Sequence, residues 1–133
     1  MTKIPSEVMD ALANEQTLKF LATINSSGVL NAVIVATVSA LDEETIIFAN
    51  LKLGKTKENL FQTKKFTISI ITPEMKNYQL RCKFIGFQES GALAEEYNEV
   101  VFNKLRLQLK EVGLAKVEEL YSTGLNSVKT KIG

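Results

Sequence analysis

The triplet Gly54-Lys55-Thr56 combines three residue types that together can hold a phosphate group. Glycine allows a tight turn, lysine supplies a positive charge, and the threonine hydroxyl can donate a hydrogen bond. Residues 55–61 have the pattern of a short helix, so the triplet lies where a strand is expected to lead into a helix N-terminus. Backbone N–H groups and the helix dipole attract anions at such a place. The triplet therefore predicts a phosphate-binding turn.

The same triplet could be mistaken for the end of a P-loop, whose full pattern is GxxxxGK[ST]. Ala49 stands where that pattern needs its first glycine, and no alternating series of strands and helices follows. Nucleotide hydrolysis is therefore not expected. A capped surface helix that carries an exposed lysine is the alternative interpretation of the triplet.

The chain contains no histidine and one cysteine, Cys82. Ser-His and Cys-His catalytic pairs are therefore excluded, as are histidine ligands for zinc or haem and a four-cysteine zinc site. No metal site is expected, and no residue is assigned a catalytic role. Cys82 lies among apolar residues of its strand and is expected to belong to the core. If the protein is an enzyme, a cofactor is expected to carry its chemistry.

Basic residues gather around the candidate turn, although the net charge is only +1. Residues 50–83 contain eight lysines and arginines against two acidic residues, whereas residues 1–49 contain two basic and six acidic residues. This distribution suits a small anionic ligand, while the net charge gives no indication of nucleic-acid or membrane binding. A solvated basic surface is the alternative.

The elements that must position the turn are mostly strands joined by short connections. A length of 133 residues indicates a single domain, 1–133. Short connections favour an antiparallel sheet, and five or six strands in a domain of this size favour a barrel with flanking helices. The expected helices are 6–14 with Ser6 as N-cap, a short helix after the turn at Gly54 within the segment 53–63, and 92–112 with Gly113 as its stop. The expected strands are 17–25, 29–41, 45–50, 64–72, 77–88 and 116–123, before a polar tail over 125–133.

The strand expected over 29–41 is apolar on both faces. Such a strand is typical of one covered by a barrel interior on one side and by a second subunit on the other. A homodimer is therefore expected. The N-terminus lacks the apolar segment of a signal peptide, and no stretch is long enough to cross a membrane, so we expect a cytoplasmic protein.

Several segments together resemble a known family. The segments VIVATVSALD, TIIFAN, KTKENLFQTKKFTISI and QLRCKFIGF follow one another, and Lys55-Thr56-x-x-Asn59 is the sharpest local match. The series resembles the flavin-binding core of the pyridoxamine 5′-phosphate oxidase-like split-barrel family, in particular its small bacterial FMN-binding proteins. The match runs from about residue 30 to 59, and its general pattern continues to residue 87.

The resemblance implies a six-stranded antiparallel split barrel with flanking helices, which pairs as a homodimer with FMN at the interface. The implied cofactor contacts are the phosphate ligands Lys55 and Thr56, the backbone of Val33, Ile34 and Val35 along the ring system, the backbone of Ala49, Asn50 and Leu51 at the isoalloxazine edge, and Arg81 near the cofactor or its phosphate.

The chain departs from the family pattern at two places. It has no tryptophan, and Ile34 stands where the small FMN-binding proteins have one near the ring. Leu51 and Lys52 replace a glycine pair before the phosphate helix. Vitamin B6 oxidation is not expected, because the arginine-rich sites of the true oxidases are not evident. Haem degradation is not expected either, because the haem-degrading branch of the family depends on histidine, which this chain lacks.

The resemblance predicts an FMN-binding flavoprotein that acts as an oxidoreductase or in electron transfer. The alternative is a non-catalytic module of the same fold that binds flavin or the deazaflavin F420, or that serves in protein interaction. The sequence indicates neither the substrate nor the electron donor or acceptor.

Overall fold

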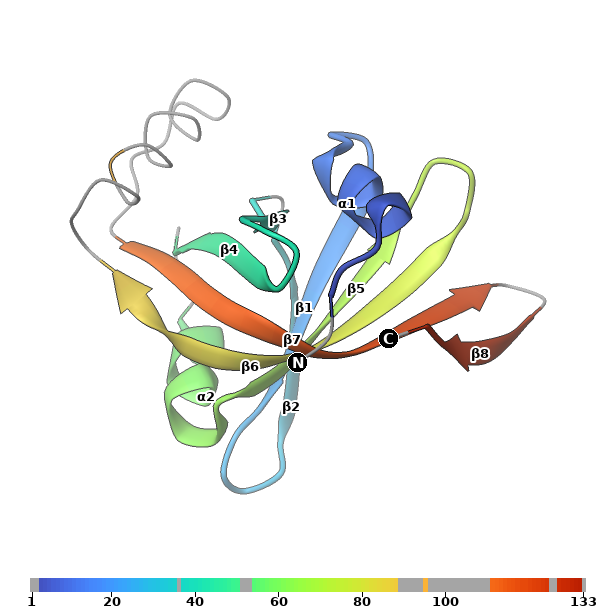
Figure 1. Cartoon of the computed structure of the whole chain (residues 1–133). Helices are drawn as coiled ribbons and strands as arrows, with labels where there is room; N and C mark the ends of the chain where they lie inside the picture. Colours follow the sequence, from blue (N-terminus) through green and yellow to red (C-terminus); the bar gives the residue numbers. More distant parts are fainter. Residues whose placement is uncertain are drawn as a thin grey trace.

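The computed structural model of the chain describes residues 3–35, 37–50, 54–88, 95, 111–124 and 127–132. These residues form two described helices, α1 (Ser6–Ala13) and α2 (Lys55–Thr63), and eight strands (Figure 1). The strands are β1 (Leu18–Ile24), β2 (Leu30–Ile34), β3 (Ser39–Ala40), β4 (Thr45–Asn50), β5 (Lys65–Ile71), β6 (Asn77–Gln88), β7 (Glu111–Gly124) and β8 (Ser127–Lys131).

The strands form one sheet in the order β2-β1-β5-β6-β7-β4-β3, and β8 pairs with β7. Every described pairing is antiparallel. The expected fold, a mainly β antiparallel split barrel with flanking helices, is therefore confirmed. The expected number of six strands is too low, because the apolar segment 29–41 forms two strands and the polar tail forms β8.

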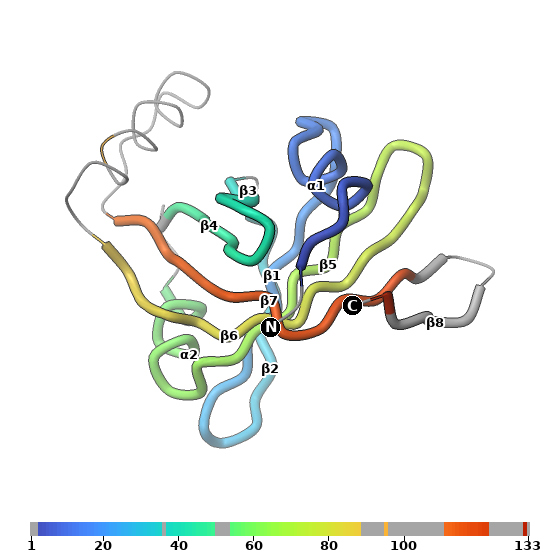
Figure 2. Tube along the Cα trace, in the orientation of Figure 1, coloured from blue at the N-terminus to red at the C-terminus, as the bar shows by residue number. Residues whose placement is uncertain are grey.

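The segment 29–41 is not the single long strand that its composition predicts. After β2, the N–H of Val35 donates to the carbonyl of Lys19 at 3.0 Å, and the N–H of Val38 donates to the carbonyl of Val35 at 3.4 Å. The segment then continues as β3, which pairs with β4. Since β2 and β3 lie at opposite ends of the strand order, the chain must bend to reach both (Figure 2). Hydrophobicity alone does not reveal this bend.

The core lies between the inward faces of the strands, where alternate residues are buried. The two described helices lie at opposite ends of the barrel (Figure 1). Val8 and Leu12 of α1 and Leu60 of α2 are fully buried. Pro5, in extended conformation, occupies the N-cap position of α1, so the prediction of Ser6 as N-cap is wrong by one residue.

The C-terminal part differs most from the sequence prediction. Most of the helix expected over 92–112 lies outside the described residues, but Glu111 and Val112 belong to β7 and not to a helix. Gly113 lies inside β7, where an added Cβ would come within 2.4 Å of Cζ of Phe48, so it does not end a helix. Strand β7 pairs with β4 on one side and with β6 on the other. These distant partners leave no trace in the local apolar spacing.

Candidate functional site

The first turn of α2 begins at Gly54, which has φ 53° and ψ −116°. L-amino acids adopt this conformation only with strain, so glycine is required for the chain to enter the helix in this direction. The N–H of Glu58 makes the first described intrahelical bond, to the carbonyl of Gly54 at 3.2 Å. The N–H groups of residues 55–57 therefore form the N-terminus of the helix, where an anion is favoured.

Lys55 is the accessible cation of this turn, with its side chain 78% exposed. Its Nζ lies 3.5 Å from Oε2 of Glu58, which is also exposed. An exposed pair of this kind adds little stability, so its partners separate easily. The ammonium of Lys55 can therefore turn to an anionic ligand at the helix N-terminus.

Thr56 occupies the same turn, but it is fully buried, with 0% of its surface exposed. Its Oγ1 accepts a hydrogen bond of 2.9 Å from Nδ2 of Asn31 on β2. A hydroxyl that accepts one bond retains its own proton for donation. The structure thus brings Lys55 and Thr56 together, and it places Thr56 on the β2 side of the helix and Lys55 at the surface.

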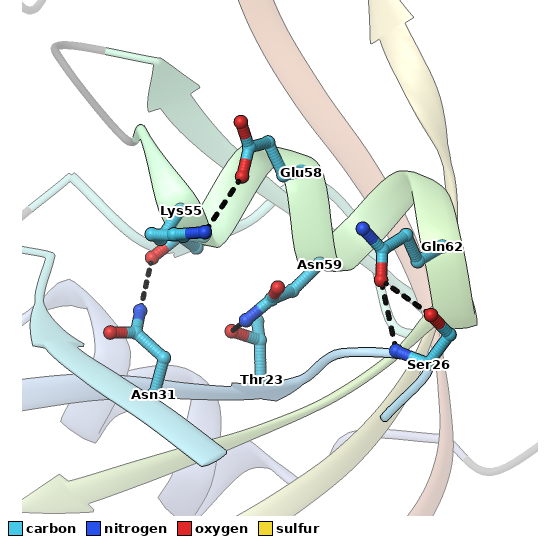
Figure 3. A network of polar contacts seen from close by, with 8 residues as sticks. Thr23, Ser26, Asn31, Lys55, Glu58, Asn59 and Gln62 are labelled. Carbon is cyan, nitrogen blue, oxygen red and sulfur yellow. Dashed lines mark hydrogen bonds and ion pairs between the residues drawn. The ribbon is translucent and has the colours of Figure 1, made fainter. Parts of the chain in front are cut away.

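The rest of α2 is bound to the hairpin of β1 and β2. Nδ2 of Asn59 donates to Oγ1 of Thr23 at 3.0 Å, and Oε1 of Gln62 accepts from both the N–H and the hydroxyl of Ser26 (Figure 3). Thr63 donates to the carbonyl of Ile24 at 3.0 Å. Asn59, the last residue of the motif found in the sequence, therefore positions the helix.

The three candidate residues on β2 and just after it alternate in direction. Val33 is half-buried against the core, Ile34 is 68% exposed, and Val35 is buried. The N–H of Val35 donates to the carbonyl of Lys19 on β1, so this donor is already used within the sheet. Ile34 is therefore the residue of the three whose side chain is open to a ligand.

The candidate residues at the end of β4 belong to the other end of the strand order, but they lie next to the segment that leads from β2 to β3. Ala49 is buried, and its N–H donates to Oγ1 of Thr37 at 3.0 Å. Asn50 is the last residue of β4 and pairs with Glu111 of β7. Leu51 lies outside the described residues. The end of β4 and the first turn of α2 are joined by residues 51–53.

Arg81 lies on the face of the sheet that points away from α2. The sheet register places it in one row with Thr67 and Ala22, and Ala22 points away from its neighbour Thr23, which is bonded to α2. A cavity of about 490 Å³ lies beside this row. The guanidinium of Arg81 is 3.6 Å from the carboxylate of Glu119, and it lies over the ring of Tyr121. Within one chain, Arg81 and the α2 turn are therefore on opposite faces.

Sequence reasoning missed one ion pair beside the turn, between Nζ of Lys57 and Oε1 of Glu111. Lys57 was counted only as part of the basic region, and Glu111 was expected in a helix. No local pattern links the two residues, which are 54 positions apart. The pairing of β7 with β4 brings Glu111 to α2.

Cys82 is buried in the core, as expected. Burial raises the pKa of the Cys82 thiol far above its usual range, and the nearby Glu118 carboxylate raises it further. The thiol is therefore protonated and is not a nucleophile. Among the described residues, no group of three or more cysteine, aspartate or glutamate side chains is arranged to hold a metal ion. The helices in the described part of the chain lack the length and hydropathy needed to span a bilayer.

The sequence matches no family model and no curated protein. The structure, however, is similar to HupZ of Group A Streptococcus, at 22% identity over 98% of this chain and 99% of the other, with a TM-score of 0.82. It is also similar to an FMN-binding protein from Syntrophomonas wolfei, at 16% identity over 92% and 87% of the two chains, with a TM-score of 0.80.

A third similar structure is a protein of the pyridoxinephosphate oxidase family from Clostridium acetobutylicum, at 12% identity over 96% of this chain and 93% of the other, with a TM-score of 0.67. An F420 reductase matches with a TM-score of 0.64, and a heme-binding protein from Mycobacterium smegmatis matches with a TM-score of 0.61. The chain therefore has the pyridoxamine 5′-phosphate oxidase-like split-barrel fold, which is found in proteins that bind several cofactors.

Proposed function

We propose that the protein binds FMN and that the first turn of α2 holds its phosphate. The observation that carries this proposal is the helix N-terminus at Gly54, whose first turn combines backbone N–H donors with the exposed ammonium of Lys55. This donor set fits a phosphate monoester. The hydroxyl of Thr56 retains a proton and would complete the set after a small adjustment of its buried side chain.

The flavin ring would lie between the two groups of candidate residues. The backbone of Val33, Ile34 and Val35 would form one edge of this site, whereas the exposed side chain of Ile34 lies on the outward face of the sheet, as Arg81 does. The end of β4, with Ala49, Asn50 and Leu51, would meet the other edge of the ring. Since the N–H of Ala49 already bonds to Thr37, its contact with the ring would be through other atoms.

A homodimer would complete the site. Leu30, 77% exposed, and Ile34 form part of an apolar outer surface on β1 and β2 that a second copy of the chain would cover. Arg81 lies on the outward face of the same sheet, away from its own α2. It would therefore reach the flavin of the partner subunit and not that of its own.

The proposed role is that of an oxidoreductase or electron-transfer protein in the cytoplasm. Bound FMN would supply the electron transfer, and the chain would bind the phosphate, orient the ring and exclude water. A specific observation favours F420 as the second candidate cofactor, because an F420 reductase shares the fold. A non-catalytic flavin carrier of the same fold is the remaining alternative.

The decisive experiment is to identify the small molecule that copurifies with the protein, by absorbance and mass. We expect a flavin spectrum and the mass of FMN, and we expect both to be lost in the double variant Lys55→Ala, Thr56→Ala. A control variant, Lys76→Ala, removes an exposed lysine from a distant turn and should retain the flavin. A colourless protein that takes up neither added FMN nor F420 would refute the proposal.

Competition between FMN and F420 for the purified protein identifies the cofactor. Oxidation of NADH or NADPH by the flavin-loaded protein distinguishes an oxidoreductase from a carrier. The homodimer is tested by sedimentation of the unaltered chain and of Leu30→Asp, which places a charge on the apolar surface. A monomer at micromolar concentration contradicts the dimer proposal.

A further inference from the structure

The ion pair of Lys57 and Glu111 lies between the two parts of the proposed site. Lys57 is in the first turn of α2, two residues after Lys55. Glu111 is the first residue of β7 and stands directly opposite Asn50, the last residue of β4. Their side chains therefore connect the proposed phosphate turn with the strand end that is proposed to meet the ring.

The ion pair of Lys57 and Glu111 is more buried than that of Lys55 and Glu58 in the same turn. The Glu111 side chain is 7% exposed, and that of Lys57 is 36% exposed. The Nζ of Lys57 also lies 5.2 Å from the ring centre of Phe87 on β6 and 5.8 Å from that of Phe61 on α2. A charge-assisted hydrogen bond and two aromatic faces thus hold the ammonium in one place.

This arrangement separates the roles of the two lysines in the turn. The ammonium of Lys57 is bound to a buried carboxylate, whereas the ion pair described for Lys55 is with the exposed Glu58. Exposed pairs exchange their partners easily, and buried charges that lose a partner are strongly destabilised. Lys55 is therefore available for an anion, and Lys57 is held in a structural contact.

We propose that Lys57 and Glu111 are positioning residues, which hold the phosphate-binding turn at a set distance from the end of β4. This inference rests on the proposed flavin function. A flavin with a phosphate must contact the turn and the strand end at the same time, so its affinity depends on the distance between them. Riboflavin has no phosphate and contacts only the ring-binding part. The pair should thus determine how much more tightly FMN binds than riboflavin.

The test compares the dissociation constants of FMN and riboflavin, measured by flavin fluorescence, in matched variants. Glu111→Gln keeps the size of the side chain and an acceptor for Lys57 but removes the charge, so its fold should be retained. Lys57→Met breaks the pair from the other side. We expect each variant to bind FMN about tenfold more weakly, within the usual range of coupling between sites, while riboflavin affinity stays within about twofold.

The double variant Lys57→Met, Glu111→Gln should bind FMN no more weakly than the single variants, because both changes remove the same interaction. Lys57→Arg keeps the charge and should retain the preference for FMN. Glu74→Gln is the control, since it removes an exposed acid from the turn between β5 and β6, away from α2 and from the proposed phosphate turn. It should leave the preference unchanged.

Three results would overturn the inference. Unchanged or tighter FMN binding by Glu111→Gln would show that the pair does not position the turn. Equal losses of FMN and riboflavin affinity, together with a lower melting temperature, would show a general structural role. An unaltered protein that binds neither flavin would overturn both this inference and the proposed function, whereas the first two results leave the proposed function intact.

Discussion

Gly54→Ala should destabilise the protein and weaken FMN binding through backbone strain alone. At φ 53° and ψ −116°, an L-residue costs roughly 1–3 kcal/mol, and a Cβ added there meets no atom within 4 Å. The loss of glycine also reduces the entropy of the unfolded chain, which returns about 0.4–1 kcal/mol. The middle values of the two ranges give an expected net destabilisation of about 1.3 kcal/mol.

The strain can be relieved only by rotation of the turn that precedes α2. Such a rotation redirects the N–H groups of residues 55–57, which are the proposed phosphate donors. If the relaxation removes about 1.4 kcal/mol of phosphate binding, FMN affinity falls about tenfold. Riboflavin affinity should change less, because the change is confined to the phosphate turn.

The assay is urea unfolding followed by far-UV circular dichroism, because the chain has no tryptophan, together with flavin titration. Two other glycines are matched controls. Gly86 also has free space around its Cβ position but no positive φ, so Gly86→Ala should not destabilise through strain. Gly28, with φ 84°, lies in the hairpin of β1 and β2, so Gly28→Ala should destabilise the protein without changing the preference for FMN.

The reasoning is refuted if Gly54→Ala is as stable as Gly86→Ala, because the strain would then be absent. It is also refuted if Gly28→Ala lowers the preference for FMN as much as Gly54→Ala does. In that case the loss would follow from general destabilisation and not from the geometry of the phosphate turn.

Three further predictions concern the barrel itself. Gly113→Ala should lower the free energy of unfolding by about 1–3 kcal/mol in urea titrations, because its Cβ would collide with the ring of Phe48; a neutral substitution would contradict this packing. The Cys82 thiol should react with a disulfide reagent only after denaturant is added, and fast labelling of the native protein would disprove its burial. Burial and a hydrogen bond to Glu7 raise the pKa of Tyr78 above its usual value near 10. The neutral phenol therefore contributes its full stability below about pH 10, and this contribution is lost as the pH rises through the pKa of Tyr78 in the folded protein. In urea unfolding above about pH 10, the free energy of unfolding of Tyr78→Phe should therefore fall less than that of the unaltered protein.

The sequence predicted those features that depend on neighbouring residues. Alternation of apolar residues identified β1, β5 and β6, and the turn residues before Gly28 identified the first hairpin. Gly54 and the helical pattern after it located the start of α2. Short connections between strands were enough to indicate an antiparallel barrel. The local pattern supplied Lys55 and Thr56, and the family resemblance added the other candidate site residues.

Only the tertiary structure decided what depends on distant partners. The bend after β2 follows from the need to reach β4, and the long β7 follows from pairing with β4 and β6. The same pairing brings Glu111 to Lys57, across 54 positions. The fold also buried Thr56 behind Asn31 and turned Arg81 to the outer face. The residue types near Gly54 indicate a phosphate site by themselves. Strand order and side-chain direction are set by long-range packing, so the barrel as a whole decides which side chains of that site are exposed and which residues hold it in place.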